Sequence, residues 1–107
     1  MGAAYIRAMR VIAKRTLREF WLLAGHEDAE EPLKSWHREA EQACWPDPHA
    51  VKAQYRSVSI LKGNRAVFNI AGNKYRLVVT INYPYGVVYV RFVGTHAEYD
   101  AIDAETV

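Results

Sequence analysis

Four residues near the end of the chain have side chains suited to cleaving RNA. Arg76 and Arg91 offer paired N–H donors that match phosphate oxygens, and the imidazole of His96 suits proton transfer near neutral pH. The phenol of Tyr99 can hydrogen-bond, stack on a base or pass a proton. RNA can be cleaved without a metal, because its own 2′-hydroxyl can attack the adjacent phosphate. These four residues therefore form a candidate catalytic set, if the fold brings them together.

The charges of the chain are unevenly distributed. No Asp or Glu occurs between Asp47 and Glu98, although the formal net charge of the chain is only +2. The basic residues of this acid-free stretch are Lys52, Arg56, Lys62, Arg65, Lys74, Arg76 and Arg91. A region with charges of one sign is typical of a protein that binds a polyanion, most often nucleic acid.

Size and composition indicate one folded domain of 107 residues, half of them hydrophobic. We expect residues 1–8 to be an N-terminal extension and residues 9–107 to be a single domain. No apolar run reaches the length of a membrane span and no signal peptide is apparent, which predicts a cytoplasmic protein without a membrane partner. With Cys44 as the only cysteine, and no His cluster with metal-ligand spacing, we expect no disulfide, metal or cofactor.

Hydrophobic periodicity predicts helices before the strands and one short helix after them. Thr16–Glu19 has the form of a capping box and predicts a helix that Gly25 ends, with Leu17, Phe20, Trp21 and Ala24 on its apolar side. A second helix is expected from about residue 29 or 32 to residue 44, and a short third one within residues 49–57. Thr95–Glu98 is a second capping box, which predicts a terminal helix to about Ile102.

Alternating apolar and polar residues predict three strands, over residues 65–71, 74–82 and 87–94, with residues 9–12 as a possible first strand. A two-residue turn at Gly72–Asn73 places Asn69 opposite Arg76, and a four-residue loop at 83–86 places Arg76 opposite Val93 and Arg91 opposite Val78. The expected core face carries Ala66, Phe68, Ile70, Tyr75, Leu77, Val79, Ile81, Val88, Val90 and Phe92. The opposite face, here called the basic face, carries Arg65, Val67, Asn69, Arg76, Val78, Thr80, Asn82, Tyr89, Arg91 and Val93.

These elements predict an α+β fold in which N-terminal helices pack on one face of a small antiparallel sheet, with a short C-terminal helix. Arg76, Arg91 and Asn69 then meet His96 and Tyr99 at one corner of the basic face. Around this corner, the expected RNA-binding residues are Lys62, Arg65, Asn69, Asn73 and Lys74. Each of these residues also has an explanation that involves no function. An arginine on the sheet can simply be solvated, His96 can simply lie at the start of a helix, and Asn73 can simply form the turn.

Two segments carry a family resemblance. Residues 67–77 (VFNIAGNKYRL) and 90–100 (VRFVGTHAEYD) resemble HigB-type toxins, which are mRNA interferases of bacterial type II toxin–antitoxin systems. The resemblance implies a RelE-like fold, cleavage of mRNA on the translating ribosome, and inhibition by a HigA-like helix-turn-helix antitoxin. Arg76 matches the sheet arginine of RelE-like toxins and Tyr99 the late tyrosine. Val67 and Asn69 stand where some members have lysines, which leaves the general base open, with His96 as our candidate.

Two other functions fit the same residues. A non-catalytic module that binds RNA or the ribosome through the basic face would show salt-dependent binding without cleaved RNA ends. A plain interaction protein would instead use Val67, Val78, Tyr89 and Val93 as a partner interface, and would have no affinity for RNA.

Overall fold

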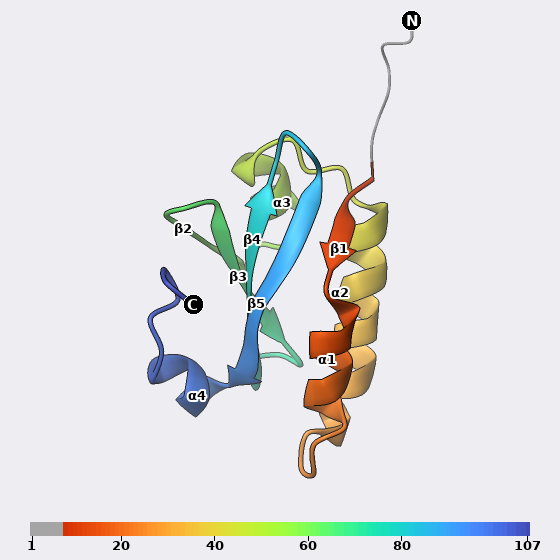
Figure 1. Cartoon of the computed structure of the whole chain (residues 1–107), viewed down its shortest axis with the longest axis vertical. Helices are drawn as coiled ribbons and strands as arrows, with labels where there is room; N and C mark the ends of the chain where they lie inside the picture. Colours follow the sequence, from red (N-terminus) through yellow and green to blue (C-terminus); the bar gives the residue numbers. More distant parts are fainter. Residues whose placement is uncertain (1–7) are drawn as a thin grey trace, which may run out of the picture.

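The computed structural model describes residues 8–107. Apart from Ala8, the predicted N-terminal extension lies outside these residues. The elements follow the order β1 (Arg10–Ile12), α1 (Lys14–Trp21), η1 (a 3-10 turn, Glu27–Ala29), α2 (Glu30–Gln42), α3 (Pro48–Gln54), β2 (Ser59–Leu61), β3 (Arg65–Ile70), β4 (Tyr75–Asn82), β5 (Val87–Thr95) and α4 (His96–Asp100). The predicted α+β fold class is confirmed, including the short third helix and the C-terminal helix (Figure 1).

The five strands form one open sheet in the order β1-β5-β4-β3-β2. The pairs β2–β3, β3–β4 and β4–β5 are antiparallel, as expected for strands joined by short turns. Strand β1 pairs parallel with β5, so the sheet is mixed rather than wholly antiparallel. The helices α1 and α2 lie side by side next to β1, whereas α4 lies beyond the end of β5 (Figure 1).

The core is formed by the helices and one face of β3 and β4. Leu17, Leu33, Val51, Leu77 and Val79 have no exposed surface. The rings of Trp36 and Trp45 lie near the ring of Phe68, with centroid distances to it of 5.3 and 6.1 Å, and Trp45 Nε1 donates to Gln54 Oε1 at 2.9 Å. The tryptophans are therefore packing residues of the core rather than surface platforms.

The predicted capping box at Thr16–Glu19 is wrong. Helix α1 begins at Lys14, directly after β1, and its N-cap Ala13 makes no side-chain hydrogen bond. Thr16 thus lies inside the first turn, and Glu19 accepts a hydrogen bond from Arg15 at 2.9 Å instead. The helix ends at Trp21, so Ala24 is exposed, and Gly25 forms the following turn with a φ of +89°. The apolar side of Leu17, Phe20 and Trp21 is buried as expected.

Helix α2 contains a histidine, His37, that is 7% exposed. Burial lowers the pKa of His37, Lys14 lowers it further, and Glu41, at 3.4 Å from Nδ1, opposes the change. The unfolded chain therefore binds a proton on His37 more readily than the folded chain does. The stability contribution of neutral His37 is present above its ordinary value of 6.5 and is lost as the pH falls below it.

We expect the urea midpoint of unfolding to decrease between about pH 7.5 and about pH 5, and to decrease less in a His37→Gln variant. Urea unfolding followed by circular dichroism at the two pH values measures both slopes. His49→Gln, at an exposed position, is the matched control and should keep the wild-type slope. Equal slopes in His37→Gln and the wild type would contradict this explanation.

Strand β5 contains a bulge that the sequence did not predict. Val79 pairs with Val90 but Val78 pairs with Phe92, so Arg91 is an extra residue between them. The register is as predicted from Asn82 to Val79, and beyond the bulge it shifts by one residue, so Arg76 pairs with Gly94 rather than Val93. Beyond the bulge, the side chains of β5 also lie on the opposite faces of the sheet from those predicted. Val93 packs against the core, and Phe92 lies on the basic face across from Val78, contrary to the predicted sorting.

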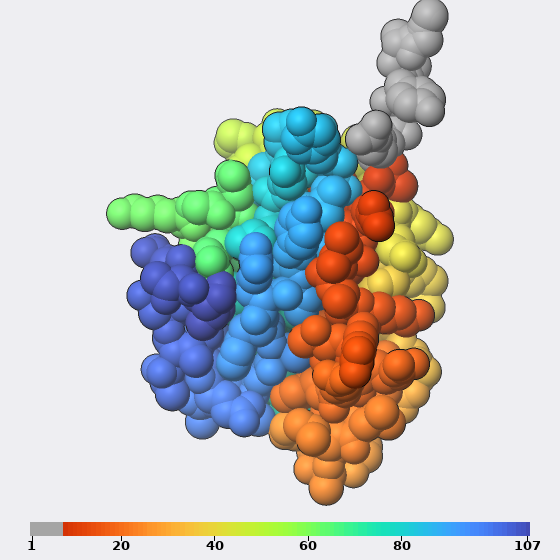
Figure 2. All heavy atoms as spheres, viewed as in Figure 1, coloured from red at the N-terminus to blue at the C-terminus, as the bar shows by residue number. Residues whose placement is uncertain are grey.

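The basic face is not open along its whole length. Val67 and Val78, which pair with each other, are 3% and 0% exposed although they lie opposite the main core. The C-terminal segment returns along β3, where the Arg65 guanidinium donates to the carbonyl oxygens of Ala104 at 3.3 Å and Val107 at 2.5 Å. Figure 2 shows this segment in dark blue beside β5 and below the β2–β3 turn. Val67 and Val78 are therefore covered, although they lie on the basic face.

Candidate functional site

The corner predicted around Arg76 is formed by three strands. Asn69, Arg76 and Gly94 are neighbours across β3, β4 and β5. Arg76 is half-buried, and its Nη1 donates to the carbonyl oxygens of Asn73 at 2.9 Å and Tyr75 at 3.3 Å. The predicted pairing of Asn69 with Arg76 is confirmed. The β3–β4 turn thus fixes the guanidinium at the end of the basic face.

The helix α4 begins two residues after Gly94. The Thr95 hydroxyl accepts from Glu98 N at 3.1 Å, and Glu98 Oε1 accepts from Thr95 N at 2.8 Å, so the predicted capping box is confirmed. His96 is the first residue of the helix and is exposed, and Tyr99 is half-buried on the same short helix. The capping box therefore fixes the direction in which His96 and Tyr99 leave the sheet.

A carboxylate that the sequence reading missed orients His96. Nδ1 of His96 lies 3.1 Å from Oδ2 of Asp100, one helical turn later. A proton on Nδ1 that is donated to Asp100 leaves the lone pair of Nε2 able to accept a proton. The His–x₃–Asp spacing directly after a capping box was the available signal, because residues i and i+4 share a helix face.

Gly94 gives α4 room to lie against the sheet. A Cβ at this position would lie 2.5 Å from Cζ of Phe92 and 2.8 Å from Oε1 of Glu98. We expect Gly94→Val to lower the free energy of unfolding by about 1–3 kcal/mol through overpacking. If this corner cleaves RNA, as its residues predict, Gly94→Val should also lower the cleavage rate by about 10²-fold, because displacement of the capping box moves His96. Urea unfolding and a cleavage assay on the same preparations test both effects.

Ala97→Val, at an exposed position of the same helix, is the matched control and should change both quantities little. Wild-type stability and cleavage in Gly94→Val would show that α4 does not depend on this contact.

The structure does not bring Arg91 to the corner. Nε of Arg91 donates to Oγ1 of Thr80 at 3.1 Å, and its guanidinium lies 5.6 Å from the ring centre of Tyr89. Thr80 is four residues beyond Arg76 on β4, which is roughly 13 Å at about 3.3 Å per residue. The bulge is the physical cause, because the predicted neighbour of Arg91 across the strands, Val78, pairs with Phe92 instead.

Two of the predicted RNA-binding cations are engaged within the protein. Lys74 forms an ion pair with Asp28, which also accepts from the Tyr75 hydroxyl at 2.5 Å. The hydrogen bond from Lys74 is the main cause that lowers the pKa of Asp28, and the same bond raises the pKa of Lys74. Arg65 is the second engaged cation, through the C-terminal carbonyls. Lys62 and Asn73 lie exposed in the β2–β3 and β3–β4 turns.

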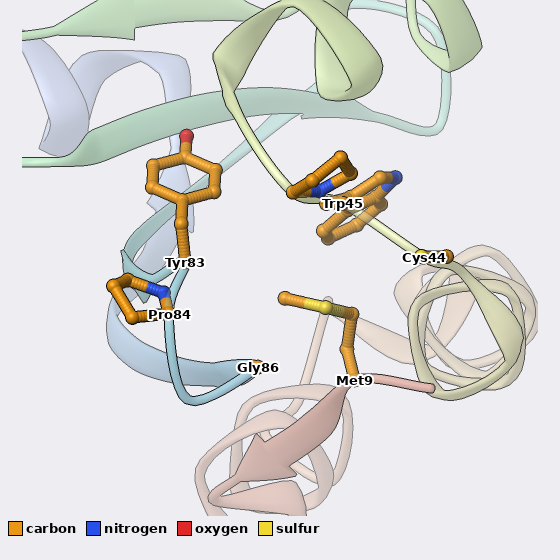
Figure 3. Close-up of a pocket in the computed structure, with 7 residues that line it drawn as sticks. Met9, Cys44, Trp45, Tyr83, Pro84 and Gly86 are labelled. Carbon is orange, nitrogen blue, oxygen red and sulfur yellow. The ribbon is translucent and has the colours of Figure 1, made fainter. Parts of the chain in front are cut away.

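A separate cavity lies at the other end of the β4–β5 hairpin (Figure 3). Its volume is about 300 Å³, and it lies between the β4–β5 turn and the chain that links α2 to α3. Its lining comprises Met9, Cys44, Trp45, Pro46, Tyr83, Pro84 and Gly86. Burial raises the pKa of Tyr83. None of the candidate catalytic residues lines this cavity, so it is distinct from the corner.

Two further observations concern residues 8–107 alone. Among them, no three or more His, Cys, Asp or Glu side chains are grouped so that they could hold a metal ion. No helix in this part of the chain is long and apolar enough to cross a membrane.

Fold and site together define a small α+β protein with a basic sheet corner next to a histidine-bearing helix. The family model of the HigB toxin, described as the RelE-like toxic component of a toxin–antitoxin system, matches residues 29–102. The matched residues include all of β3, β4, β5 and α4. The chain therefore belongs to the HigB toxin family, and the family implies an antitoxin partner. A comparison with curated proteins finds no match.

Proposed function

We propose that this toxin is a metal-independent endoribonuclease that cleaves mRNA on the translating ribosome and so arrests translation and growth. The observation that carries the proposal is the corner at which Arg76, fixed by the β3–β4 turn, pairs with Gly94, two residues before the helix that bears the His96–Asp100 pair and Tyr99. These groups supply the cation, the proton acceptor and the phenol that attack by a 2′-hydroxyl requires.

Each group at the corner has a definite role in this mechanism. His96 removes the proton from the 2′-hydroxyl through Nε2, while Asp100 holds the imidazole through Nδ1. Arg76 binds the non-bridging oxygens of the scissile phosphate and stabilises the charge that develops on them. Tyr99 positions the neighbouring base or passes the proton to the leaving 5′-oxygen, and Asn69 orients the phosphate or Arg76.

The remaining candidate residues bind the RNA outside the corner. Arg91 contacts a phosphate further along the strand, and Lys62, Asn73, Arg65 and Lys74 contribute the positive field of the basic face. Because Lys74 and Arg65 are engaged by Asp28 and the C-terminal segment, their direct contribution is smaller than that of the exposed Lys62. The cognate antitoxin is a HigA-like helix-turn-helix protein, and the toxin acts in the cytoplasm.

The chemistry of the RNA ends tests this proposal. Attack by the 2′-hydroxyl forms a bond to phosphorus and expels the 5′-oxygen of the next nucleotide, so the products are a 2′,3′-cyclic phosphate and a 5′-hydroxyl. We expect both ends on mRNA fragments when the purified toxin is added to translating ribosomes. The ends are distinguished by whether polynucleotide kinase must phosphorylate the 5′ end before ligation.

Fragments with 5′-phosphates and 3′-hydroxyls would contradict the mechanism. Salt-dependent binding of RNA without any cleaved ends would favour a non-catalytic RNA-binding module instead.

A further inference from the structure

A shallow groove lies on the basic face, at the end of the sheet away from α4. It has a volume of about 520 Å³ and is formed by the β2–β3 turn, the ends of β4 and β5, and the β4–β5 turn. The residues that matter here are Asn64, Thr80, Asn82, Tyr85, Tyr89 and Arg91. No carboxylate lines the groove, because the whole of it falls within the acid-free stretch.

Two tyrosines supply aromatic surface in this groove. Tyr89 pairs with Thr80 across the strands and is half-buried, and the guanidinium of Arg91 lies 5.6 Å from its ring centre. Tyr85 is 69% exposed at the tip of the β4–β5 turn. Aromatic rings at the surface, next to cations and without nearby carboxylates, are the arrangement on which single-stranded RNA bases stack.

The backbone that carries Tyr85 is held in a defined conformation. Oδ1 of Asn82 accepts from Tyr85 N at 3.1 Å, and the Asn82 carbonyl accepts from Gly86 N at 2.8 Å. Gly86 has a φ of +68°, which glycine adopts without strain, and Pro84 restricts the turn further. The Tyr85 ring therefore lies on an ordered turn, and less conformational entropy is lost when a base stacks on it.

The bulge gives Arg91 its place beside these rings. Nε of Arg91 donates to Thr80 Oγ1 at 3.1 Å, which orients the planar guanidinium. Within residues 8–107 no other hydrogen bond from Arg91 is found, so its Nη groups are available to phosphate oxygens. An aromatic surface for a base and a hydrogen-bond donor for a phosphate thus lie together in the groove.

We propose that this groove is an accessory subsite for single-stranded RNA, in which a nucleobase stacks on Tyr85 and Tyr89 while Arg91 binds an adjacent phosphate. The inference rests on the proposed function, because it places a further part of the same RNA strand roughly 13 Å from Arg76 along β4. The corner cleaves the strand, and the groove holds it in register.

RNA fits this groove better than a second protein does. A protein partner that covered it would have to pair the Arg91 guanidinium with a carboxylate and bury two phenol hydroxyls. A nucleotide offers a flat ring to the tyrosines and an anion to Arg91 at the spacing of one residue of the strand. Lys62, exposed next to Gly63 in the β2–β3 turn, extends the positive field beside the groove.

Fluorescence anisotropy of the full chain with a short, fluorescein-labelled single-stranded RNA tests the subsite. Tyr85→Leu, which removes the ring at an exposed position, should weaken binding by about 5- to 150-fold. Tyr85→Phe keeps the ring and should bind as the wild type does. A second series uses RNAs that each carry one abasic nucleotide at a different position. At one of these positions the abasic nucleotide should weaken binding to the wild type, whereas it should not weaken binding to Tyr85→Leu.

The outcomes separate this inference from the proposed function. If the wild type binds and cleaves RNA but Tyr85→Leu and Tyr89→Leu bind intact and abasic RNA as the wild type does, the subsite is overturned and the cleavage mechanism stands. If the two Leu variants lose affinity only for the antitoxin, the groove is a protein interface and the subsite is again overturned. If the wild type neither binds nor cleaves RNA, both fail together.

Discussion

Replacing His96 by alanine is expected to lower the rate of mRNA cleavage by about 10²- to 10⁴-fold, the range typical of a general base. The physical reason is the pair that His96 forms with Asp100 at 3.1 Å, which holds the imidazole at the start of α4. Its side chain is exposed, so the variant should fold with wild-type stability. Cleavage on translating ribosomes, with urea unfolding of the same preparation, measures both quantities.

Two companion measurements distinguish a base from a structural residue. Free imidazole added to His96→Ala should restore part of the cleavage rate, because it can occupy the vacated position as a proton acceptor. Asp100→Asn keeps the imidazole but weakens its orientation, and should cause a smaller loss than His96→Ala. Unchanged cleavage in His96→Ala would show that another group, or the ribosome itself, takes the proton.

Replacing Arg76 by alanine is expected to lower cleavage by about 10²- to 10³-fold, as loss of one preorganised donor to developing charge does in other active sites. Arg76 is held by the carbonyls of Asn73 and Tyr75 and lies between Asn69 and Gly94. A donor fixed in this way does not need to reorganise when charge appears on the phosphate. Expression of the variant should therefore no longer arrest growth.

Arg38→Ala removes an exposed arginine from α2, outside the basic face, and is the matched control. It should cleave at the wild-type rate. Guanidinium ion should partly rescue Arg76→Ala and should leave His96→Ala unchanged, whereas imidazole should show the reverse preference. A folded Arg76→Ala that cleaves at the rate of Arg38→Ala would remove Arg76 from the site.

Sequence alone predicted most of the fold because its signals were local. The turn at Gly72–Asn73 determined the pairing of Asn69 with Arg76, and the capping box at Thr95 determined where α4 begins. The bulge at Arg91 had no such signal, because the residues around it are apolar on both sides of the strand and any register satisfies them. The start of α1 was misplaced because Thr16 and Glu19 have the spacing of a capping box, although the helix begins two residues earlier, at Lys14.

The site was predictable to the extent that it depends on neighbouring strands. The pairing of Asn69 with Arg76 followed from the length of the β3–β4 turn, and the start of the helix with His96 followed from its capping box. The ion pair of Lys74 with Asp28 and the contact of Arg65 with Ala104 and Val107 did not, because they join segments far apart in the sequence that no periodicity relates. Arg91 was assigned to the catalytic corner on a register that the bulge changes. Its observed position is in the groove with Tyr85 and Tyr89, where we propose that it binds RNA.

Four of the seven Lys and Arg residues between Asp47 and Glu98 thus lie in three different surroundings. One arginine, Arg76, lies at the corner with α4, and another, Arg91, lies in the aromatic groove. Lys74 and Arg65 are neutralised or covered by segments of the chain outside the sheet. These residues have the same charge, but their hydrogen-bond partners show that they have different surroundings.

Mapping the 5′ ends of cellular mRNAs after brief induction tests the central claim most directly. With the wild-type toxin we expect new 5′-hydroxyl ends inside coding sequences, at positions related to the reading frame, because the proposed cleavage takes place on the translating ribosome. With Arg76→Ala and His96→Ala, expressed to the same level, these ends should be absent. Growth arrest by the wild type without new mRNA ends, or the same ends with both variants, would contradict the assignment of this corner as a ribonuclease site.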